Sequence, residues 1–127
     1  MEEIVKRPKV VKKVWGSEEW IVNTEEYCGK ILRLKKGKRC SLHYHEIKDE
    51  TFYILSGSVL MEYEGIKMLQ SRDSLRILRG KLHRFSGLEN SVIIEVSTHH
   101  EEEDSYRIVG QLSGNVPKDI LKEFGVK

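Results

Sequence analysis

The stretch from Gly37 to Gly57, GKRCSLHYHEIKDETFYILSG, is the most informative part of this 127-residue chain. One residue separates His43 from His45, so both side chains project to the same side of a β-strand. Glu50 begins the next apolar run and can bring a carboxylate back to the two imidazoles, and His83 lies in a later strand-like segment. Two or three imidazoles with one carboxylate suit a divalent first-row metal with open positions. The sequence therefore predicts that His43, His45, Glu50 and His83 bind one manganese, iron, cobalt, nickel or zinc ion.

Short β-prone runs separated by turn residues dominate the chain. We expect strands at residues 10–14, 18–23, 29–35, 41–45, 51–55, 59–64, 67–70, 74–77, 83–87 and 91–97. Many short strands at near-regular spacing are typical of an antiparallel sandwich or barrel. One helix is expected after Pro117, with Ile120, Leu121 and Phe124 on the face that packs on the barrel. The length predicts one all-β domain over residues 1–127.

The composition argues against several classes of partner. Hydrophobic residues make up 39% and charged residues 33% of the chain, and the net charge is +2, so nothing requires a nucleic acid or an acidic membrane. The apolar runs are too short to span a bilayer and the N-terminus lacks a signal-peptide core, so we expect a cytoplasmic protein. Cys28 and Cys40 have no zinc-type spacing and are expected to be thiols. Cys40, close to His43 in sequence, is interpreted as a small half-buried residue rather than as a catalytic thiolate.

Two further expectations follow from the pattern of polar and apolar residues. The run 99–104 (HHEEED) is too polar for a core and is predicted to be an exposed loop, with both of its histidines in solvent. In the strand at 51–55, Phe52 and Ile54 share one face, while Tyr53 and Leu55 share the other. Apolar groups on both faces suggest that a second subunit covers the outer face, and we therefore expect a homodimer.

The spacing within residues 37–57 resembles, at every fixed position, the first signature of the cupin superfamily in its longer-spaced form. The second cupin signature is partly present, with Gly80 and His83 in place. Other residues stand where that signature has glycine, proline and asparagine: Arg72, Leu78 and Gly87. The resemblance implies a single-domain cupin, which is a double-stranded β-helix or jelly-roll barrel, here with a short C-terminal helix.

A narrower resemblance extends over most of the chain. The segment 14–18 (VWGSE) is similar to the Pro-Trp-Gly segment that opens the type II mannose-6-phosphate isomerase domain, which also occurs behind mannose-1-phosphate guanylyltransferases. Residues 41–45 (SLHYH) resemble its Ser-Leu-Gln-x-His, with His43 in place of glutamine. Residues 94–107 resemble its Ile-Glu-Val-Gln…Glu-Asp-Asp-x-x-Arg ending, although the closing Tyr-Gly-Arg is missing after Arg107. The resemblance implies sugar-phosphate chemistry as a class.

Several charged residues are candidates for contact with a substrate. Lys30, Lys48 and Arg84 lie near ligand segments in sequence, and Arg107 matches the narrower resemblance, so these four are candidates to bind a phosphate or carboxylate group. Glu95 stands mid-strand in an apolar run, either as a paired buried carboxylate or as a catalytic base. We take Glu50 and Glu95 as the candidate catalytic carboxylates.

The leading hypothesis is a metal-dependent isomerase or epimerase of a sugar or sugar phosphate. The metal would polarise a carbonyl and acidify the adjacent C–H, a carboxylate would move the proton, and basic side chains would hold the phosphate. The expected partner is therefore a small-molecule substrate. Two alternatives use the same site: a non-haem metal oxygenase of the cupin type, and a non-catalytic cupin that binds a sugar or another metabolite.

Overall fold

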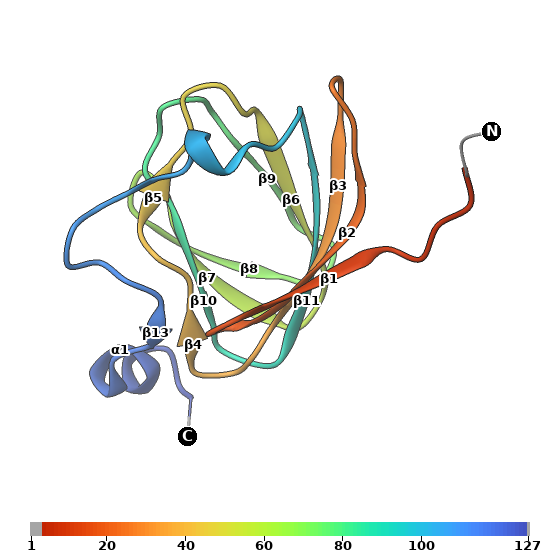
Figure 1. Cartoon of the computed structure of the whole chain (residues 1–127). Coiled ribbons are helices and arrows are strands. Elements are labelled where there is room, and N and C mark those ends of the chain that lie inside the picture. The colour runs from red at the N-terminus through yellow and green to blue at the C-terminus, as the bar shows by residue number, and fades with distance from the viewer. Residues whose placement is uncertain (1–3, 127) are drawn as a thin grey trace.

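Two antiparallel sheets face each other in the computed structural model, which describes residues 4–126 (Figure 1). The first sheet has the strand order β1 (Lys9–Lys13), β2 (Gly16–Asn23), β3 (Cys28–Leu34), β11 (Ser91–Ser97), β6 (Glu50–Ser56) and β9 (Ser74–Ile77). The second has the order β13 (Gly114–Asn115), β4 (Lys38–Arg39), β10 (Arg84–Gly87), β7 (Ser58–Glu62) and β8 (Ile66–Gln70). A separate pair joins β12 (Tyr106–Arg107) to β5 (His43–Tyr44). The predicted all-β fold is confirmed, and every predicted strand has a counterpart.

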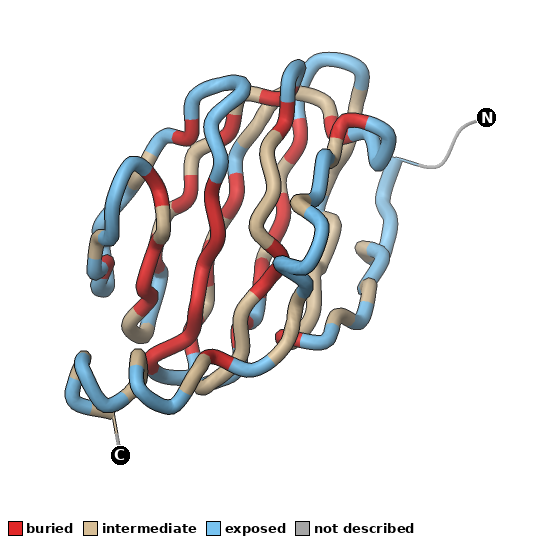
Figure 2. The backbone as a smooth tube through the Cα atoms, turned by 90° about the vertical axis from the view of Figure 1, so that its left-hand side faces the viewer, coloured by how far each residue is buried: buried red, intermediate tan, exposed pale blue. Residues whose placement is uncertain are grey.

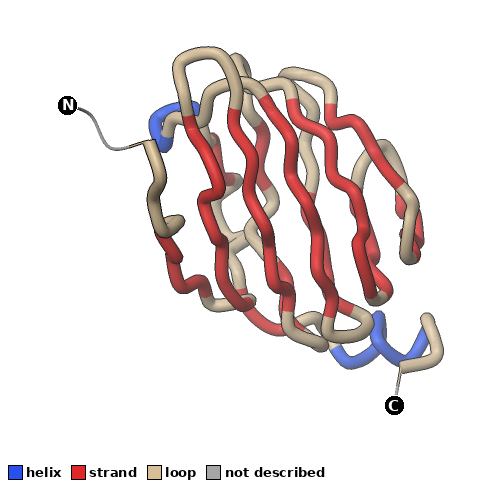
Figure 3. The backbone as a smooth tube through the Cα atoms, turned by 90° about the vertical axis from the view of Figure 1, so that its right-hand side faces the viewer, coloured by secondary structure: helices blue, strands red, loops and turns tan. Residues whose placement is uncertain are grey.

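Figure 3 faces the six-stranded sheet, whose strands run side by side from the N-terminal edge to β9. Its inward residues alternate with outward ones along each strand, as expected for a sheet with one face on the core. Leu32 on β3, Ile93 on β11 and Ile54 on β6 lie opposite one another in register and form one buried apolar row. With Trp15 and Phe85 they belong to the hydrophobic core between the sheets.

The same alternation carries charged residues into the barrel one row further along. Lys30 lies two residues before Leu32 on β3, and Glu95 lies two residues after Ile93 on β11, so both must face inward. Glu50, at the start of β6, also faces inward, and all three charged side chains are buried. The barrel interior therefore has an apolar end that forms the core and a charged end that forms a candidate site.

The turn between β6 and β7 requires the glycine that closes the 37–57 signature. Gly57 has a positive φ of 98°, which L side chains rarely adopt. A Cβ atom at this position would also lie only 2.7 Å from the carbonyl oxygen of Asn90. The glycine thus lets the two sheets connect where the chain passes close to the turn before β11.

The C-terminal helix is confirmed as α1 (Lys118–Glu123), which begins directly after Pro117. It lies beyond β13 and β4 at one end of the barrel (Figure 1). The three apolar residues of its predicted inner face, Ile120, Leu121 and Phe124, are half-buried. Within residues 4–126, no helix is both long enough and apolar enough to cross a bilayer.

The prediction of an exposed loop at residues 99–104 is wrong in part, because only residues 101–103 are exposed. The segment forms the 3-10 helix η1 (Glu102–Asp104), and His100 and Asp104 are buried. The side chain of Asn23 holds the backbone of His100 with hydrogen bonds of 2.9 and 3.1 Å. Figure 2 shows that buried stretches interrupt the exposed turns at the barrel ends. Burial occurs here because polar groups pair with one another, which a hydrophobicity pattern does not reveal.

The outer face of the six-stranded sheet carries apolar side chains, as the sequence suggested. Leu55 is 52% and Val96 is 55% exposed in the single chain, and Tyr53 is half-buried. The homodimer itself stays a prediction.

Candidate metal centre

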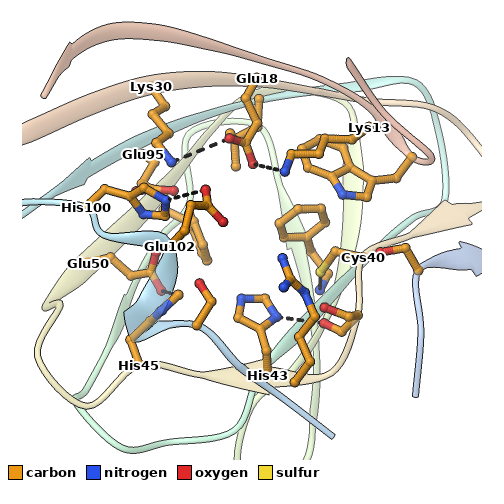
Figure 4. A pocket seen from close by; sticks show the side chains of 18 of the residues that line it. Lys13, Glu18, Lys30, Cys40, His43, His45, Glu50, Glu95, His100 and Glu102 are labelled. Atoms are coloured by element: carbon orange, nitrogen blue, oxygen red, sulfur yellow. Dashed lines mark hydrogen bonds and ion pairs between the residues drawn. The ribbon is translucent and has the colours of Figure 1, made fainter. Parts of the chain in front are cut away.

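Three histidines from different parts of the chain converge inside the charged end of the barrel. His43 lies on β5, His45 follows it, and His83 lies just before β10. The backbones of His43 and His83 pair through hydrogen bonds of 3.2 and 2.9 Å, which brings the two segments together. One ligand atom from each of the three imidazoles lies within 4.8 Å of the others, so they form a group that can hold a metal ion. Figure 4 shows His43, His45 and Glu50 around this point.

The other ring nitrogen of each histidine fixes which atom faces the centre. Nδ1 lies 2.8 Å from the Ser41 carbonyl oxygen in His43, 3.1 Å from that of Asp104 in His45 and 3.0 Å from that of Lys81 in His83. A carbonyl oxygen only accepts hydrogen bonds, so each Nδ1 is the donor. In a neutral imidazole, Nε2 then keeps a lone pair for a metal. Burial, with a contribution from neighbouring His83, lowers the pKa of His43 to about 3, so its ring is neutral at pH 7.

Glu50 completes the group with a buried carboxylate. Its Oε2 lies 3.2 Å from Nε2 of His45 and 3.1 Å from Nε2 of His83. Burial raises the pKa of Glu50, but the positive charge of Lys48, 3.3 Å from Oε1, lowers it, and the pKa is held well below its usual value. The carboxyl group is therefore an anion.

These short distances fit a shared cation better than direct hydrogen bonds. Among residues 4–126, Oε2 of Glu50 and Nε2 of His83 are buried without a hydrogen-bond partner, although they are close together. Two buried acceptors with nothing between them are unfavourable. With metal–ligand bonds of about 2.1 Å, neighbouring ligand atoms lie about 3.0 Å apart at right angles and about 3.4 Å apart in a tetrahedron. The separations of Glu50 Oε2 from His45 and His83, 3.2 and 3.1 Å, fall between these values, so this pair of contacts fits a shared divalent transition metal.

The Lys48 side chain connects Glu50 to two other buried side chains, Glu95 and His100. Its ammonium lies 3.3 Å from Oε1 of Glu50, 3.1 Å from Oε2 of Glu95 and 3.1 Å from Nδ1 of His100. Burial lowers the pKa of Lys48, but the charges of Glu95 and Glu50 outweigh it and raise the pKa above its usual value. The three acceptors match the three protons of an ammonium. Lys48 lines the cavity, but its donors are used within the protein rather than left for a substrate.

The other predicted substrate contacts differ in position. Lys30 lies in the cavity wall with 1% of its surface exposed; its ammonium is 3.5 Å from Glu18 and 4.3 Å above the ring of Trp20. Arg107 lines the same cavity from β12, where it is paired in register with His43.

Arg84 does not fit the prediction that it binds substrate. It is buried outside the cavity lining, where its guanidinium donates to the carbonyl oxygen of Cys40 and to the side chain and backbone of Gln111. Successive residues of an extended segment point to opposite sides, so a chain that turns His83 toward the centre turns Arg84 away from it. The role of Arg84 is to attach residue 111 to the barrel.

Glu95 faces the cavity and is paired, as one of its two interpretations proposed. Its Oε2 accepts hydrogen bonds from Lys48 and from the Ser97 hydroxyl, at 3.1 and 3.2 Å. Within the described part of the chain, no hydrogen bond reaches its other oxygen, Oε1. Glu95 is therefore both a partner of Lys48 and an acceptor open to the cavity.

The cavity beside the three histidines has a volume of about 290 Å³. Several polar lining residues were not singled out from the sequence, and Figure 4 shows four of them pointing inward: Lys13, Glu18, His100 and Glu102. Glu18 could have been found from the alternation of β2, on which it lies opposite Leu32. His100 carries no comparable signal. His99, the neighbour of His100 in sequence, lies outside this cavity, with its Nδ1 2.7 Å from the Thr24 carbonyl oxygen.

Cys40 also lines the cavity but is not a thiolate. Burial raises its pKa to about 12, and its sulfur accepts a hydrogen bond from the Phe85 backbone at 3.3 Å. Cys28 and Cys40 are both free and buried. The interpretation of Cys40 as a packing residue therefore fits the structure.

Comparison with solved structures identifies proteins with the same fold as this chain. The fold is similar to KdgF from Halomonas sp. (TM-score 0.64, 20% identity, covering 68% of this chain and 81% of that chain). It is also similar to oxalate decarboxylase from Bacillus subtilis (TM-score 0.71, 20% identity, 94% of this chain and 35% of that chain). A third similar structure is a conserved protein with a double-stranded β-helix domain from Klebsiella pneumoniae (TM-score 0.59, 17% identity, 65% and 75%). At these identities the likeness concerns the fold, and the predicted cupin fold is confirmed.

No match was found among curated proteins. The sequence pattern of a family described as mannose-6-phosphate isomerase C-terminal matches residues 2–109. Since the match spans most of the chain, this protein belongs to the mannose-6-phosphate isomerase C-terminal family.

Proposed function

We propose that this protein is a metal-dependent isomerase or epimerase of a small sugar or sugar phosphate. One observation carries the proposal. The imidazoles of His43, His45 and His83 and the carboxylate of Glu50 converge beside a cavity that holds a second carboxylate, Glu95. The family match supports the same class of substrate.

The chemistry requires a Lewis acid and a proton acceptor next to each other. When bound, a divalent ion would polarise a substrate carbonyl and so acidify the neighbouring C–H. Glu95 is the proposed acceptor, because its Oε1 is open to the cavity while Lys48 and Ser97 hold Oε2. A positioned carboxylate that accepts a proton from C2 and returns it to C1, while the hydroxyl proton on O2 passes to O1, interconverts aldose and ketose. Lys48 keeps Glu95 and Glu50 in separate roles by binding one oxygen of each.

The proposed anion-binding residues are Lys30 and Arg107. Within residues 4–126, the Lys30 ammonium makes one hydrogen bond, to Glu18 at 3.5 Å, of the three that it can donate. Its remaining protons suit a phosphate, a carboxylate or a sugar hydroxyl. The cavity of about 290 Å³ lies at the small end of ligand pockets. A monosaccharide or its phosphate is therefore the proposed substrate, rather than a larger conjugate.

Two measurements test this proposal together. We expect elemental analysis to find about one transition-metal ion per chain, and proton NMR in D₂O to show an aldose phosphate converting to an isomer with deuterium incorporated beside the carbonyl. His45→Ala should abolish both metal content and turnover.

His99→Ala is the matched control, because His99 lies outside the cluster and contacts Thr24 instead. It should keep both properties. Turnover by His45→Ala at the wild-type rate would contradict the proposal. Binding of the sugar phosphate without deuterium exchange or product would instead indicate a non-catalytic binding protein.

A further inference from the structure

Strand β5, which carries His43 and leads directly into His45, is held in place by a distant segment of the chain. We call residues 100–111 the clamp segment. Its strand β12 pairs with β5, with Tyr106 opposite Tyr44 and Arg107 opposite His43. The rings of Tyr44 and Tyr106 stack with centroids 5.1 Å apart. In Figure 1 the clamp segment passes beside β5.

Further backbone hydrogen bonds extend this pairing beyond β12. The Ile108 amide donates to the Leu42 carbonyl oxygen at 3.0 Å, and the Leu42 amide donates to the Gln111 carbonyl oxygen at 3.0 Å. On its other edge, β5 has only the single bridge between His43 and His83 in the described structure. The clamp segment is therefore the main lateral support of the ligand strand.

Asp104 of the clamp segment contacts every residue from His45 to Lys48. Its Oδ1 accepts hydrogen bonds from the backbone amides of Glu46 and Ile47, at 2.9 and 3.1 Å. Its Oδ2 accepts from the backbone amide of Lys48, at 2.9 Å. Its carbonyl oxygen accepts from Nδ1 of His45, at 3.1 Å. The side chain is 4% exposed, so these contacts are shielded from water.

These contacts of Asp104 are made with the loop that connects two of the candidate ligands, His45 and Glu50. The loop between His45 and Glu50 belongs to no strand, so its shape depends on other support. Three amides that converge on one carboxylate form charge-assisted hydrogen bonds, which are shorter and stronger than neutral ones. The same loop carries Lys48, which binds Oε1 of Glu50.

We propose that Asp104 is the positioning residue of the metal centre. It orients the imidazole of His45 through the backbone, and through its carboxylate it sets the loop that places Lys48 and Glu50. This inference rests on the metal site of the proposed function. Groups that orient a metal ligand typically change metal affinity by about 10- to 100-fold when they are removed.

Cobalt(II) binding in the absence of substrate tests the inference. We expect Asp104→Ala and Asp104→Asn to raise the cobalt dissociation constant by about 10- to 100-fold, measured by competition with a chelator. Asn keeps Oδ1 for Glu46 and Ile47 but presents an NH₂ group to the Lys48 amide, so this variant keeps part of the support if the alanine variant does not fold. Each variant should also show an altered visible absorption spectrum at saturating cobalt.

The spectrum separates positioning from stability, since a protein that is merely less stable gives the wild-type spectrum once it is folded and saturated. Glu103→Gln is the matched control, because it removes a charge from an exposed side chain on the same 3-10 helix. It should leave both readouts unchanged.

Wild-type affinity and spectrum in an Asp104 variant that folds would overturn the inference while leaving the proposed function intact. Cobalt binding by the wild type without any isomerisation would count against the proposed function alone. Absence of cobalt binding by the wild type would overturn both.

Discussion

Replacement of Lys48 by methionine should destabilise the protein more than any surface substitution. Its ammonium is 3.3 Å from Glu50 and 3.1 Å from Glu95. At an effective dielectric constant of about 20, each contact corresponds to about 5 kcal/mol of Coulomb attraction. Desolvation of the buried ions offsets much of that attraction. Removing one partner of a buried ion pair nevertheless costs about 3–5 kcal/mol, because the other partner is left uncompensated. We expect a loss of this size in the free energy of unfolding at pH 7.

The loss should depend on pH in a defined direction. The pKa of Glu50 is held well below its usual value, so its contribution to stability is fully present above the unfolded-state pKa of about 4.3. That contribution is lost as the pH falls through the folded-state pKa. Without Lys48, Glu50 loses the positive charge that lowers its pKa and can take up a proton in the folded state. The difference between wild type and Lys48→Met should therefore be largest near pH 7 and should shrink below about pH 4.

Urea unfolding with a chelator present measures this difference, with tryptophan fluorescence as the signal because Trp15 is buried in the core. Lys36→Met is the control: Lys36 is exposed, and its replacement should change stability by less than about 0.5 kcal/mol. A loss under about 1 kcal/mol for Lys48→Met at pH 7 would refute the reasoning. A difference that grew as the pH fell would refute it as well.

Three further substitutions separate the two ends of the barrel. Glu95→Gln should lower kcat by about 100-fold or more, because it removes the proposed proton acceptor, and should leave the metal content at the wild-type level, because Glu95 is not a candidate ligand. NMR turnover and elemental analysis measure the two effects. An unchanged kcat would exclude the role assigned to Glu95. Lys30→Met should raise KM for a sugar phosphate by about 10-fold or more, since a charge-assisted hydrogen bond contributes about 1.5–3 kcal/mol. The KM for the unphosphorylated sugar should rise less. Equal effects on both sugars would argue against an anion site. Ile93→Ala should lower the free energy of unfolding by about 2–5 kcal/mol, because Ile93 is completely buried. The cobalt dissociation constant of the folded protein should stay unchanged. A weakened metal site would show that the core and the site are coupled.

The fold could be predicted because its signals are local. Alternating side chains and turn residues located the main strands, and the spacing between Gly37 and Gly57 identified the cupin architecture. The short strands β4, β12 and β13 were missed, since a two-residue strand is too short to show any periodicity. Their existence depends on partners that are distant in sequence.

The candidate site was predictable in part for the same reason. The three histidines and Glu50 stand at fixed spacings, and the structure brings them together. His100 and Asp104 were assigned to solvent because their neighbours are all polar, whereas specific pairing with Lys48 and with three backbone amides buries them. Arg84 lies outside the cavity lining although it is next to His83 in sequence, because successive residues of an extended segment point to opposite sides.

The change from apolar to charged residues along the same inward rows has a consequence for how the protein matures. A slip of one residue of β6 against β11 would turn Ile54 outward and turn Glu50 away from the histidines at the same time. Misaligned chains would therefore lack the ion-binding arrangement, and capture of a cation would stabilise only correctly aligned ones. Metal binding would then favour the correctly aligned fold, because a ligand that binds only one state stabilises that state.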